Sequence, residues 1–372
     1  MKIKKLITSL VFGLLATSCI QDEALNSEAA IDACTGDEVQ LASIDPESKT
    51  VTIYISQVTD LSSLQLEFFL PEGATIEPAQ ASAGDNPPIY DFSGSSTREF
   101  IVTSEDGEWK TSYSISIVRT ELPTIFHFDA LKSTSTTYDI FYEFQAGTST
   151  SDPYALEWAS GNPGYKLTGM AQSASDYPTT IDRNGVSQSC VRLETKSTGS
   201  FGSLVGMPIA AGNIFIGSFD VSNALSDPLK ATQIGYPFLK IPVALKGYFK
   251  YKPGDVYKEG ENVVDKTDRF DIYAIFYETD DQVQFLDGDN RFESDHLVKL
   301  ARIQAEDAVA TDTWEEFYIP FETVGNRSID TQKLAEGKYK VGIVFSSSIE
   351  GDLFNGAVGS TLYIDEVELI YE

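Results

Sequence analysis

The segment that most constrains the fold is the apolar run DRFDIYAIFYE at residues 268–278. One parity of the run carries four apolar side chains, Phe270, Ile272, Ala274 and Phe276. Tyr273 and Ile275 occupy the other parity. Because successive strand side chains point to opposite faces, a strand that is apolar on both faces must lie between two layers. No stretch shows a convincing amphipathic helix of useful length, so we expect an all-β chain.

Three further segments toward the C-terminus have strand patterns: EEFYIPF (315–321), YKVGIVFSSS (339–348) and STLYIDEVELIY (360–371). The loops between them are rich in Gly, Pro and Asn, which favour turns. Long strands joined in this way are typical of two packed sheets. We therefore expect residues 122–372 to form a large jelly-roll β-sandwich.

The last of these segments contains a change of parity. Leu362 and Ile364 share one parity, whereas the apolar residues after them share the other: Val367, Leu369 and Tyr371. A single bulge at Asp365-Glu366 would bring both sets to the same face of the sheet. Bulges re-aim side chains, so we expect Asp365 to be a ligand for a neighbouring loop or for a cation.

Shorter strands separated by turns fill residues 35–121. They are expected at 51–56, 64–68, 100–102 and 113–117. The segments LPEGATIEP and TSEDGEWKTSYSISIV resemble the immunoglobulin-like modules that precede functional domains in many surface lipoproteins. We predict a small Ig-like β-sandwich that acts as a spacer and ends near residues 119–125, where Pro123 favours a turn.

The N-terminus has the order of a lipoprotein signal. Three lysines (Lys2, Lys4 and Lys5) precede an apolar stretch at 6–16, which is too short to span a bilayer. Small residues then lead to Cys19. We predict a signal peptide at residues 1–18, lipidation of Cys19 and a flexible tether at 19–34, which would anchor the chain in an outer membrane.

Acidic residues follow the cysteine at Asp22 and Glu23, which resembles the signal for display on the surface of gut Gram-negative bacteria. The formal net charge of the whole chain is −29. Such a charge repels phosphate backbones and anionic lipids, which argues against a nucleic-acid partner. Cys34 and Cys190 lie too far apart in the sequence to indicate a disulfide framework, so we expect free thiols.

Five ordered segments from about residue 125 onward resemble the PCMD family of carbohydrate metabolism domains: LEWASGNPGY (156–165), MPIAAGNIFIGSF (207–219), IGYPFLKIPVALKGYFKYKPGD (234–255), DRFDIYAIFYE (268–278) and EGDLFNGAVGSTLYIDEVELIY (350–371). The resemblance implies a link to glycans and a fold similar to carbohydrate-binding jelly rolls. It does not imply an established reaction.

Sugar binding needs exposed aromatic faces beside polar groups that orient hydroxyls. Two loops combine these residue types. The candidates for ligand binding are Trp158, Asn162 and Tyr165 in the first loop, and Tyr248, Tyr251 and Asp255 near the end of an expected strand. The alternative for Trp158 is a core position, because tryptophan is usually well buried.

Catalytic and metal sites have weaker support. Neither His127 nor His296 lies near a nucleophile signature, and clustered zinc ligands are absent. Glycoside hydrolysis needs two carboxylates, and the candidates are Asp352, Asp365 and Glu366. The acidic segment DGDNRFESD (287–295) superficially resembles a calcium loop, although a solvated hairpin loop is favoured. We expect no cofactor; the alternative is calcium as a structural ion, for which Asp365 is the candidate ligand.

These observations favour a surface-exposed, non-catalytic lipoprotein that binds a poly- or oligosaccharide and works beside neighbouring glycan-uptake proteins. A glycoside hydrolase with a carboxylate pair is the first alternative. An adhesion or assembly protein is the second.

Overall fold

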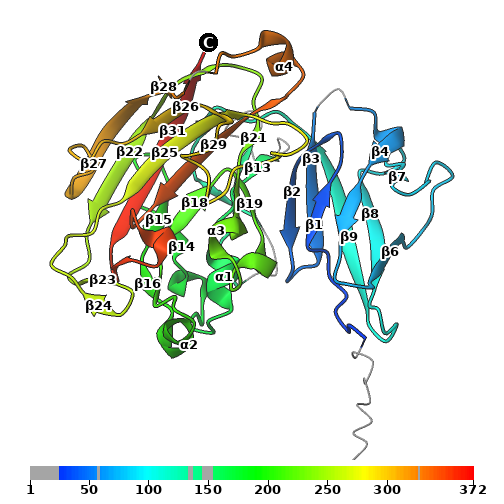
Figure 1. Cartoon of the computed structure of the whole chain (residues 1–372), viewed down its shortest axis with the longest axis horizontal. Coiled ribbons are helices and arrows are strands. Elements are labelled where there is room, and N and C mark those ends of the chain that lie inside the picture. The colour runs from blue at the N-terminus through cyan, green and yellow to red at the C-terminus, as the bar shows by residue number, and fades with distance from the viewer. Residues whose placement is uncertain (1–24, 57–58, 133–136, 145–153, 326) are drawn as a thin grey trace, which may run out of the picture.

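The computed structural model describes residues 25–56, 59–132, 137–144, 154–325 and 327–372. Two β-rich domains lie side by side, the N-terminal one in blue and cyan and the larger one from green to red (Figure 1). The all-β prediction is confirmed, because helices in the described residues are single short turns such as α1 (Asn162–Lys166) and α2 (Gly199–Leu204). None of these helices is long and apolar enough to cross a membrane.

The N-terminal domain is built on one five-stranded sheet. Its order is β2 (Val39–Asp45), β3 (Thr50–Ile55), β9 (Lys110–Arg119), β8 (Thr97–Thr103) and β6 (Thr75–Pro78). Two small strand pairs accompany it, β1 (Ala33–Thr35) with β5 (Glu67–Phe69) and β4 (Leu64–Gln65) with β7 (Ile89–Tyr90). Alternate residues of β3 and β9, such as Val51, Ile53 and Ile115, fill a core of their own.

The larger domain contains two main sheets. One has the order β14 (Thr179–Asp182), β15 (Cys190–Glu194), β31 (Thr361–Tyr371), β22 (Pro242–Lys252) and β27 (Thr311–Pro320). The other has the order β18 (Asn213–Phe215), β29 (Tyr339–Ser346), β25 (Asp271–Glu278), β26 (Leu297–Arg302) and β28 (Glu322–Thr323). Every residue of β25 is buried, as expected for a strand that is apolar on both faces.

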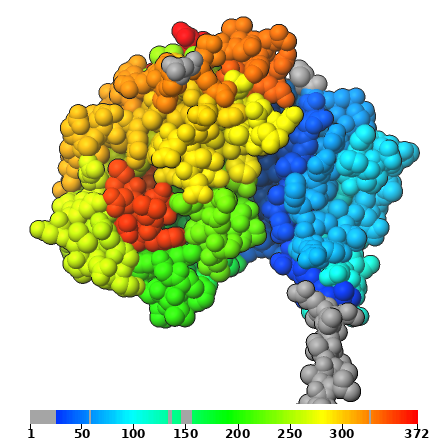
Figure 2. Space-filling view, in the orientation of Figure 1, coloured from blue at the N-terminus to red at the C-terminus, as the bar shows by residue number. Residues whose placement is uncertain are grey.

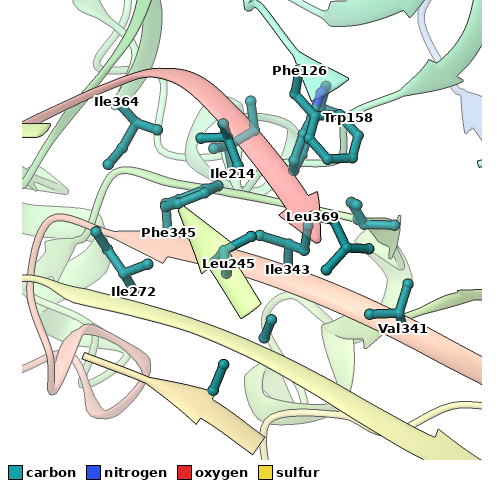
Figure 3. Close-up of a cluster of buried hydrophobic side chains, with 14 of the residues drawn as sticks. Phe126, Trp158, Ile214, Leu245, Ile272, Val341, Ile343, Phe345, Ile364 and Leu369 are labelled. Carbon is teal, nitrogen blue, oxygen red and sulfur yellow. The ribbon is translucent and has the colours of Figure 1, made fainter. Parts of the chain in front are cut away.

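The core between the two sheets contains inward side chains from both. Figure 3 shows Leu245, Ile364 and Leu369 from the first sheet, and Ile214, Ile272, Ile343 and Phe345 from the second. Trp158 lies beside Phe126 in the same cluster. The two packed layers follow from the period of two in these strands, because alternate side chains on each sheet face the other sheet.

The predicted bulge in the last strand is confirmed. Lys246 of β22 pairs with Glu368, and Tyr248 pairs with Asp365, so β31 has one extra residue between these pairs. Glu366 adopts a left-handed backbone with φ of 48°, which is uncommon for a residue other than glycine. All four apolar residues on either side of the bulge are at most 1% exposed: Leu362, Ile364, Val367 and Leu369.

The two domains share a buried interface that the sequence analysis did not anticipate. Leu41 and Tyr54 of the N-terminal domain belong to the main core of the larger domain. Tyr54 lies edge-on to Tyr236, whose hydroxyl donates to Gln40 at 3.0 Å. The N-terminal domain is thus packed against the larger one.

A buried carboxylate reinforces this interface. Glu157 is only 4% exposed and accepts a hydrogen bond from Lys132 at 2.6 Å. It also accepts from Ser43 at 3.1 Å and from Thr52 at 3.3 Å, both in the N-terminal domain. A buried carboxylate with several donors favours one relative placement of its neighbours, because losing any donor would leave it unsatisfied.

Candidate functional site

Trp158 is a core residue. Its side chain is 4% exposed and its ring lies 5.1 Å from Phe126 and 5.0 Å from Phe128. The backbone N–H of Trp158 donates to Phe141, which continues the pairing of β12 (Phe141–Phe144) with β13 (Tyr154–Glu157) and turns the indole inward. The expectation of an exposed stacking ring is wrong, and the alternative of a core position is confirmed.

Asn162 is fully buried and holds two segments together. Its amide nitrogen donates to the Thr179 carbonyl at 2.8 Å, and its amide oxygen accepts from the Thr179 N–H at 3.1 Å. The side chain therefore fastens α1 to β14, and its burial leaves it inaccessible to the sugar hydroxyls that we expected it to contact. Tyr165 is 6% exposed and donates to the Ser197 carbonyl at 3.0 Å, but its ring lines the cavity described below.

The second group of predicted residues is not brought together. Tyr251 is 2% exposed, lies 4.8 Å from the Phe270 ring and donates to the Ser347 carbonyl, so its expected exposure is wrong. Tyr248 lies three residues earlier on β22, so its side chain points to the outer face of the sheet. There it is half-buried, in contrast to the buried Tyr251. Asp255 is exposed in the loop after β22.

Asp365 has the role of a loop ligand that the bulge predicted. It is fully buried and accepts hydrogen bonds from the N–H groups of Val186 at 2.6 Å and Ser187 at 3.1 Å. Burial raises its pKa to about 7, against the effect of these donors. Glu366 binds His127 Nδ1 at 3.1 Å. Asp365 and Glu366 thus tie strands and loops together, and neither lines the cavity.

An apolar cavity of about 180 Å³ lies on the outer side of the second sheet of the larger domain, where Tyr273 and Val344 face away from the core between the sheets. It is bordered by α1, α2, α3 (Pro228–Ala231), the loop before β26 and the short helix η4 (Gly351–Leu353). Figure 2 shows the green, yellow and orange-red segments of this region meeting on the face turned to the viewer. Its walls include Phe215, Phe219 and Phe354.

Each of the five segments that carry the family resemblance contributes to this cavity. Examples in chain order are Tyr165, Phe215, Ile234, Asp271 and Asp352. These segments are spread over the whole domain in the sequence, and the fold brings them to one concave space. Ligand sites are commonly concave and apolar with a few polar groups that converge, so we take this cavity as the candidate site.

Charged side chains gather at one end of the cavity. Asp271 on β25 is 3% exposed and is held by Arg302, whose Nε and Nη2 donate to its two oxygens at 3.1 and 2.7 Å. Burial raises the pKa of Asp271, whereas the Arg302 guanidinium opposes that rise. The nearby charge of Asp352 adds to the rise, so the two carboxylates are close enough to interact.

Arg291 completes this polar end. Its Nη2 binds Asp352 Oδ2 at 2.5 Å, and its Nη1 donates to the Gly288 carbonyl. The guanidinium also lies 5.9 Å from the centre of the Tyr273 ring. Within the described residues, the buried Nε of Arg291 has no hydrogen-bond partner. Arg291 and Asp352 both line the cavity, so their charged groups can contact a ligand there.

The arrangement suits a small ligand with polar and apolar sides. A hydroxyl can accept from the Arg291 guanidinium and donate to the Asp352 carboxylate, both of which line the cavity, because it has one hydrogen and two lone pairs. The apolar walls can cover C–H groups. The volume is below the 300–1,000 Å³ range of drug-sized ligand pockets, so the ligand part that enters must be small.

Sequence reasoning identified Asp352 and Tyr165 but missed Asp271, Tyr273 and Arg291. The signal for Arg291 was its place inside the acidic segment 287–295. There Asp287 accepts from the N–H groups of Asp289 and Asn290, as in a self-capped turn. Among the residues that the structure describes, no group of three or more potential metal ligands is present. Cys34 and Cys190 are free and buried, as expected.

Two family models match separate parts of the chain. The family model described as "putative carbohydrate metabolism domain" matches residues 127–370. A second model, described as "SGBP, N-terminal" (SGBP meaning surface glycan-binding protein), matches residues 31–117. No curated protein matches the chain.

Solved structures extend the similarity. A Bacteroides thetaiotaomicron protein described as a putative glycoside hydrolase is 48% identical, with 95% of this chain and 99% of that chain covered and a TM-score of 0.81. A Bacteroides vulgatus protein with the same description is 43% identical. That match covers 68% of this chain and 100% of the other, with a TM-score of 0.63.

Proposed function

This chain belongs to the putative carbohydrate metabolism domain family, and from that membership we propose that it is a surface lipoprotein that binds a glycan unit in the cavity of its larger domain. The observation that carries the proposal is the convergence of Arg291, Asp352 and Asp271 at one end of an apolar cavity. The N-terminal match to a surface glycan-binding protein supports the same function.

Binding in this cavity follows from the chemistry of a sugar. Its hydroxyls would exchange hydrogen bonds with the Asp352 carboxylate and the Arg291 guanidinium, while its C–H groups would contact the apolar walls. We further propose that Cys19, which lies outside the described residues, carries the lipid. Neighbouring glycan-uptake proteins would then receive the bound glycan at the outer membrane.

The test is a glycan array and calorimetry with a purified Cys19→Ser chain. Arg291→Met keeps an apolar side chain but removes the donors, and we expect it to weaken binding by about tenfold or more. Glu261→Gln is the matched control, because Glu261 is exposed, does not line the cavity and lies 3.7 Å from its ion-pair partner Lys258. Unchanged affinity in Arg291→Met, with an unchanged unfolding midpoint, would contradict the proposed site.

A glycoside hydrolase is the second candidate, because two carboxylates line the cavity. Burial and the charge of Asp352 raise the pKa of Asp271, and a carboxyl with a raised pKa is suited to act as a general acid. Release of reducing sugar by the wild type, abolished in Asp352→Asn, would establish hydrolysis. Binding without release would favour the binding protein, and neither activity would favour an adhesion or assembly role.

A further inference from the structure

A row of aromatic and basic side chains lies on the outer face of the first sheet of the larger domain. The strands β27, β22 and β31 are neighbours in that sheet. Alternation sends one set of side chains into the core, such as Phe249 and Phe317, which are 3% and 5% exposed. The other set contains four aromatic residues, here named the aromatic face: Tyr248, Trp314, Tyr318 and Tyr363.

Lys250 links two of these rings across three strands. Its Nζ lies 4.5 Å from the centre of the Trp314 ring and 4.8 Å from the centre of the Tyr363 ring. Tyr363 pairs in register with Lys250 on one side and with Arg192 of β15 on the other. Adjacent strands are about 4.8 Å apart, and both ring centres lie within 5 Å of the same Nζ, so the Trp314 and Tyr363 rings are at most about 9 Å apart, the scale of a short stretch of sugar chain.

The second row of the face is also mixed. Tyr318 pairs directly with Lys246, which pairs with Glu368 on its other side. Tyr318 is 60% exposed, so most of its ring does not contribute to packing. Cross-strand aromatic contacts alone would stabilise the sheet, but they do not require a ring so open to solvent.

The charges around the face indicate which chain it would accept. Lys246 is paired with Glu368 at 2.7 Å and Arg192 with Glu194, so most basic groups here already have a carboxylate. The protein as a whole carries a net charge of −29, which repels a polyanion. Aromatic rings favour the C–H faces of sugars, and the mixed lysine and glutamate side chains can donate to and accept from hydroxyls.

We infer that the aromatic face is a second glycan site, which holds an extended, neutral polysaccharide chain across β27, β22 and β31. The inference rests on the proposed glycan-binding function but uses residues that are separate from the cavity. The cavity accepts one small unit, whereas the face gives a longer chain several contacts.

The test compares two kinds of variant in the full chain carrying Cys19→Ser. The face variant is Trp314→Ala with Tyr318→Ala, and the cavity variant is Arg291→Met. Trp109→Ala is the matched control, because Trp109 is 62% exposed in the N-terminal domain. Affinity electrophoresis measures binding of neutral polysaccharides and of a polyuronate, and calorimetry measures binding of the monosaccharides or short oligosaccharides identified by the array.

We expect the face variant to bind neutral polysaccharide about tenfold more weakly than the wild type, with binding of the small glycan unchanged. The control should match the wild type, and the polyuronate should bind less tightly than the neutral chain. Unchanged polysaccharide affinity in a folded face variant would overturn the inference while leaving the cavity proposal intact. Tighter binding of the polyuronate would overturn the assignment of a neutral chain.

The remaining outcomes separate this inference from the proposed function. If the face variant loses polysaccharide binding and Arg291→Met retains every affinity, the face is supported and the cavity assignment fails. If the wild type binds no glycan of any length, both proposals fail. A circular-dichroism melt of each variant establishes that it is folded. A variant with Trp314→Phe in place of Trp314→Ala keeps a ring at this position and should recover part of the affinity that the face variant loses.

Discussion

Arg291 and Asp352 form an ion pair at the polar end of the cavity, with Nη2 and Oδ2 2.5 Å apart. The two residues are 61 positions apart in the sequence, and they join the loop before β26 to η4. Their side chains are 14% and 31% exposed, so water screens the pair only in part. The ion pair therefore contributes both to the shape of the cavity and to its charge.

Asp352→Ala should destabilise the protein because it leaves the largely buried Arg291 without its carboxylate. We expect a loss of about 1–3 kcal/mol in the free energy of unfolding, measured by urea denaturation. Asp352→Asn keeps an oxygen that can accept from Arg291 and should lose less. Equal stability of the alanine variant and the wild type would show that the pair contributes nothing to folding.

Gly351→Ala should alter the cavity without removing a polar group. A Cβ at Gly351 would lie 2.3 Å from the Cβ of Ala211, so η4 must move away from the opposite wall. We expect glycan affinity to fall by about tenfold, because Asp352 would move with η4. Gly94→Ala is the control, since its Cβ would meet no atom within 4 Å. Calorimetry that gives equal affinities for both variants would refute this expectation.

Trp158→Ala should reduce stability and not act directly on binding. Deleting a buried aromatic ring typically costs about 3–5 kcal/mol, through lost contacts with rings such as Phe126 and through the space left behind. The exposed Trp109→Ala should change the free energy of unfolding by about 0.5 kcal/mol or less. The two unfolding midpoints, measured under the same conditions, check the difference. A midpoint for Trp158→Ala equal to that of the wild type would mean that the indole is not part of the core.

Glu143 should make stability depend on pH. Its oxygens accept from the N–H groups of His127 and Phe128, but burial raises its pKa from 4.5 to about 7. The nearby Nε1 of Trp158 lowers the pKa of Glu143, but its geometry is not that of a normal hydrogen bond. The folded state thus holds this proton more tightly than the unfolded state, so the contribution to stability is complete below pH 4.5 and is lost as the pH rises through about 7.

Glu143→Gln removes this titration. Relative to the wild type, the variant should gain about 3 kcal/mol in the free energy of unfolding between pH 4.5 and pH 8. The difference between the two proteins cancels the effect of Asp365, whose pKa is raised in the same direction. Urea titrations at several pH values test the slope. A difference that is constant with pH would contradict the raised pKa.

Glu157→Ala should weaken the contact between the two domains. It removes the acceptor shared by Lys132, Ser43 and Thr52, so we expect a loss of about 1–3 kcal/mol. Limited proteolysis should then cut near residues 119–125 faster than in the wild type. Glu157→Gln keeps one acceptor, so its rate of digestion should lie between those of the wild type and Glu157→Ala. Identical digestion of all three proteins would indicate that this contact does not couple the domains.

Local patterns in the sequence were sufficient to predict the strands and one detail of their pairing. Alternation along 268–278 predicted a strand buried on both faces, and the change of parity at Asp365-Glu366 predicted the bulge. Both predictions succeeded because side-chain direction in a strand depends on the backbone of the same few residues. The family resemblance identified the segments that line the cavity, but not how they meet.

The direction of loop side chains and the partners of charged residues were decided by the tertiary structure. A Gly- and Pro-containing loop is compatible with an exposed or a buried Trp158. In the structure the indole is buried because it packs against the rings of Phe126 and Phe128. Asn162 is buried because Thr179 satisfies both ends of its amide. Arg291 and Asp352 come into contact only when two loops that are distant in the sequence fold together. Such a contact could not be predicted, because neither residue lies in a local sequence pattern that indicates its partner.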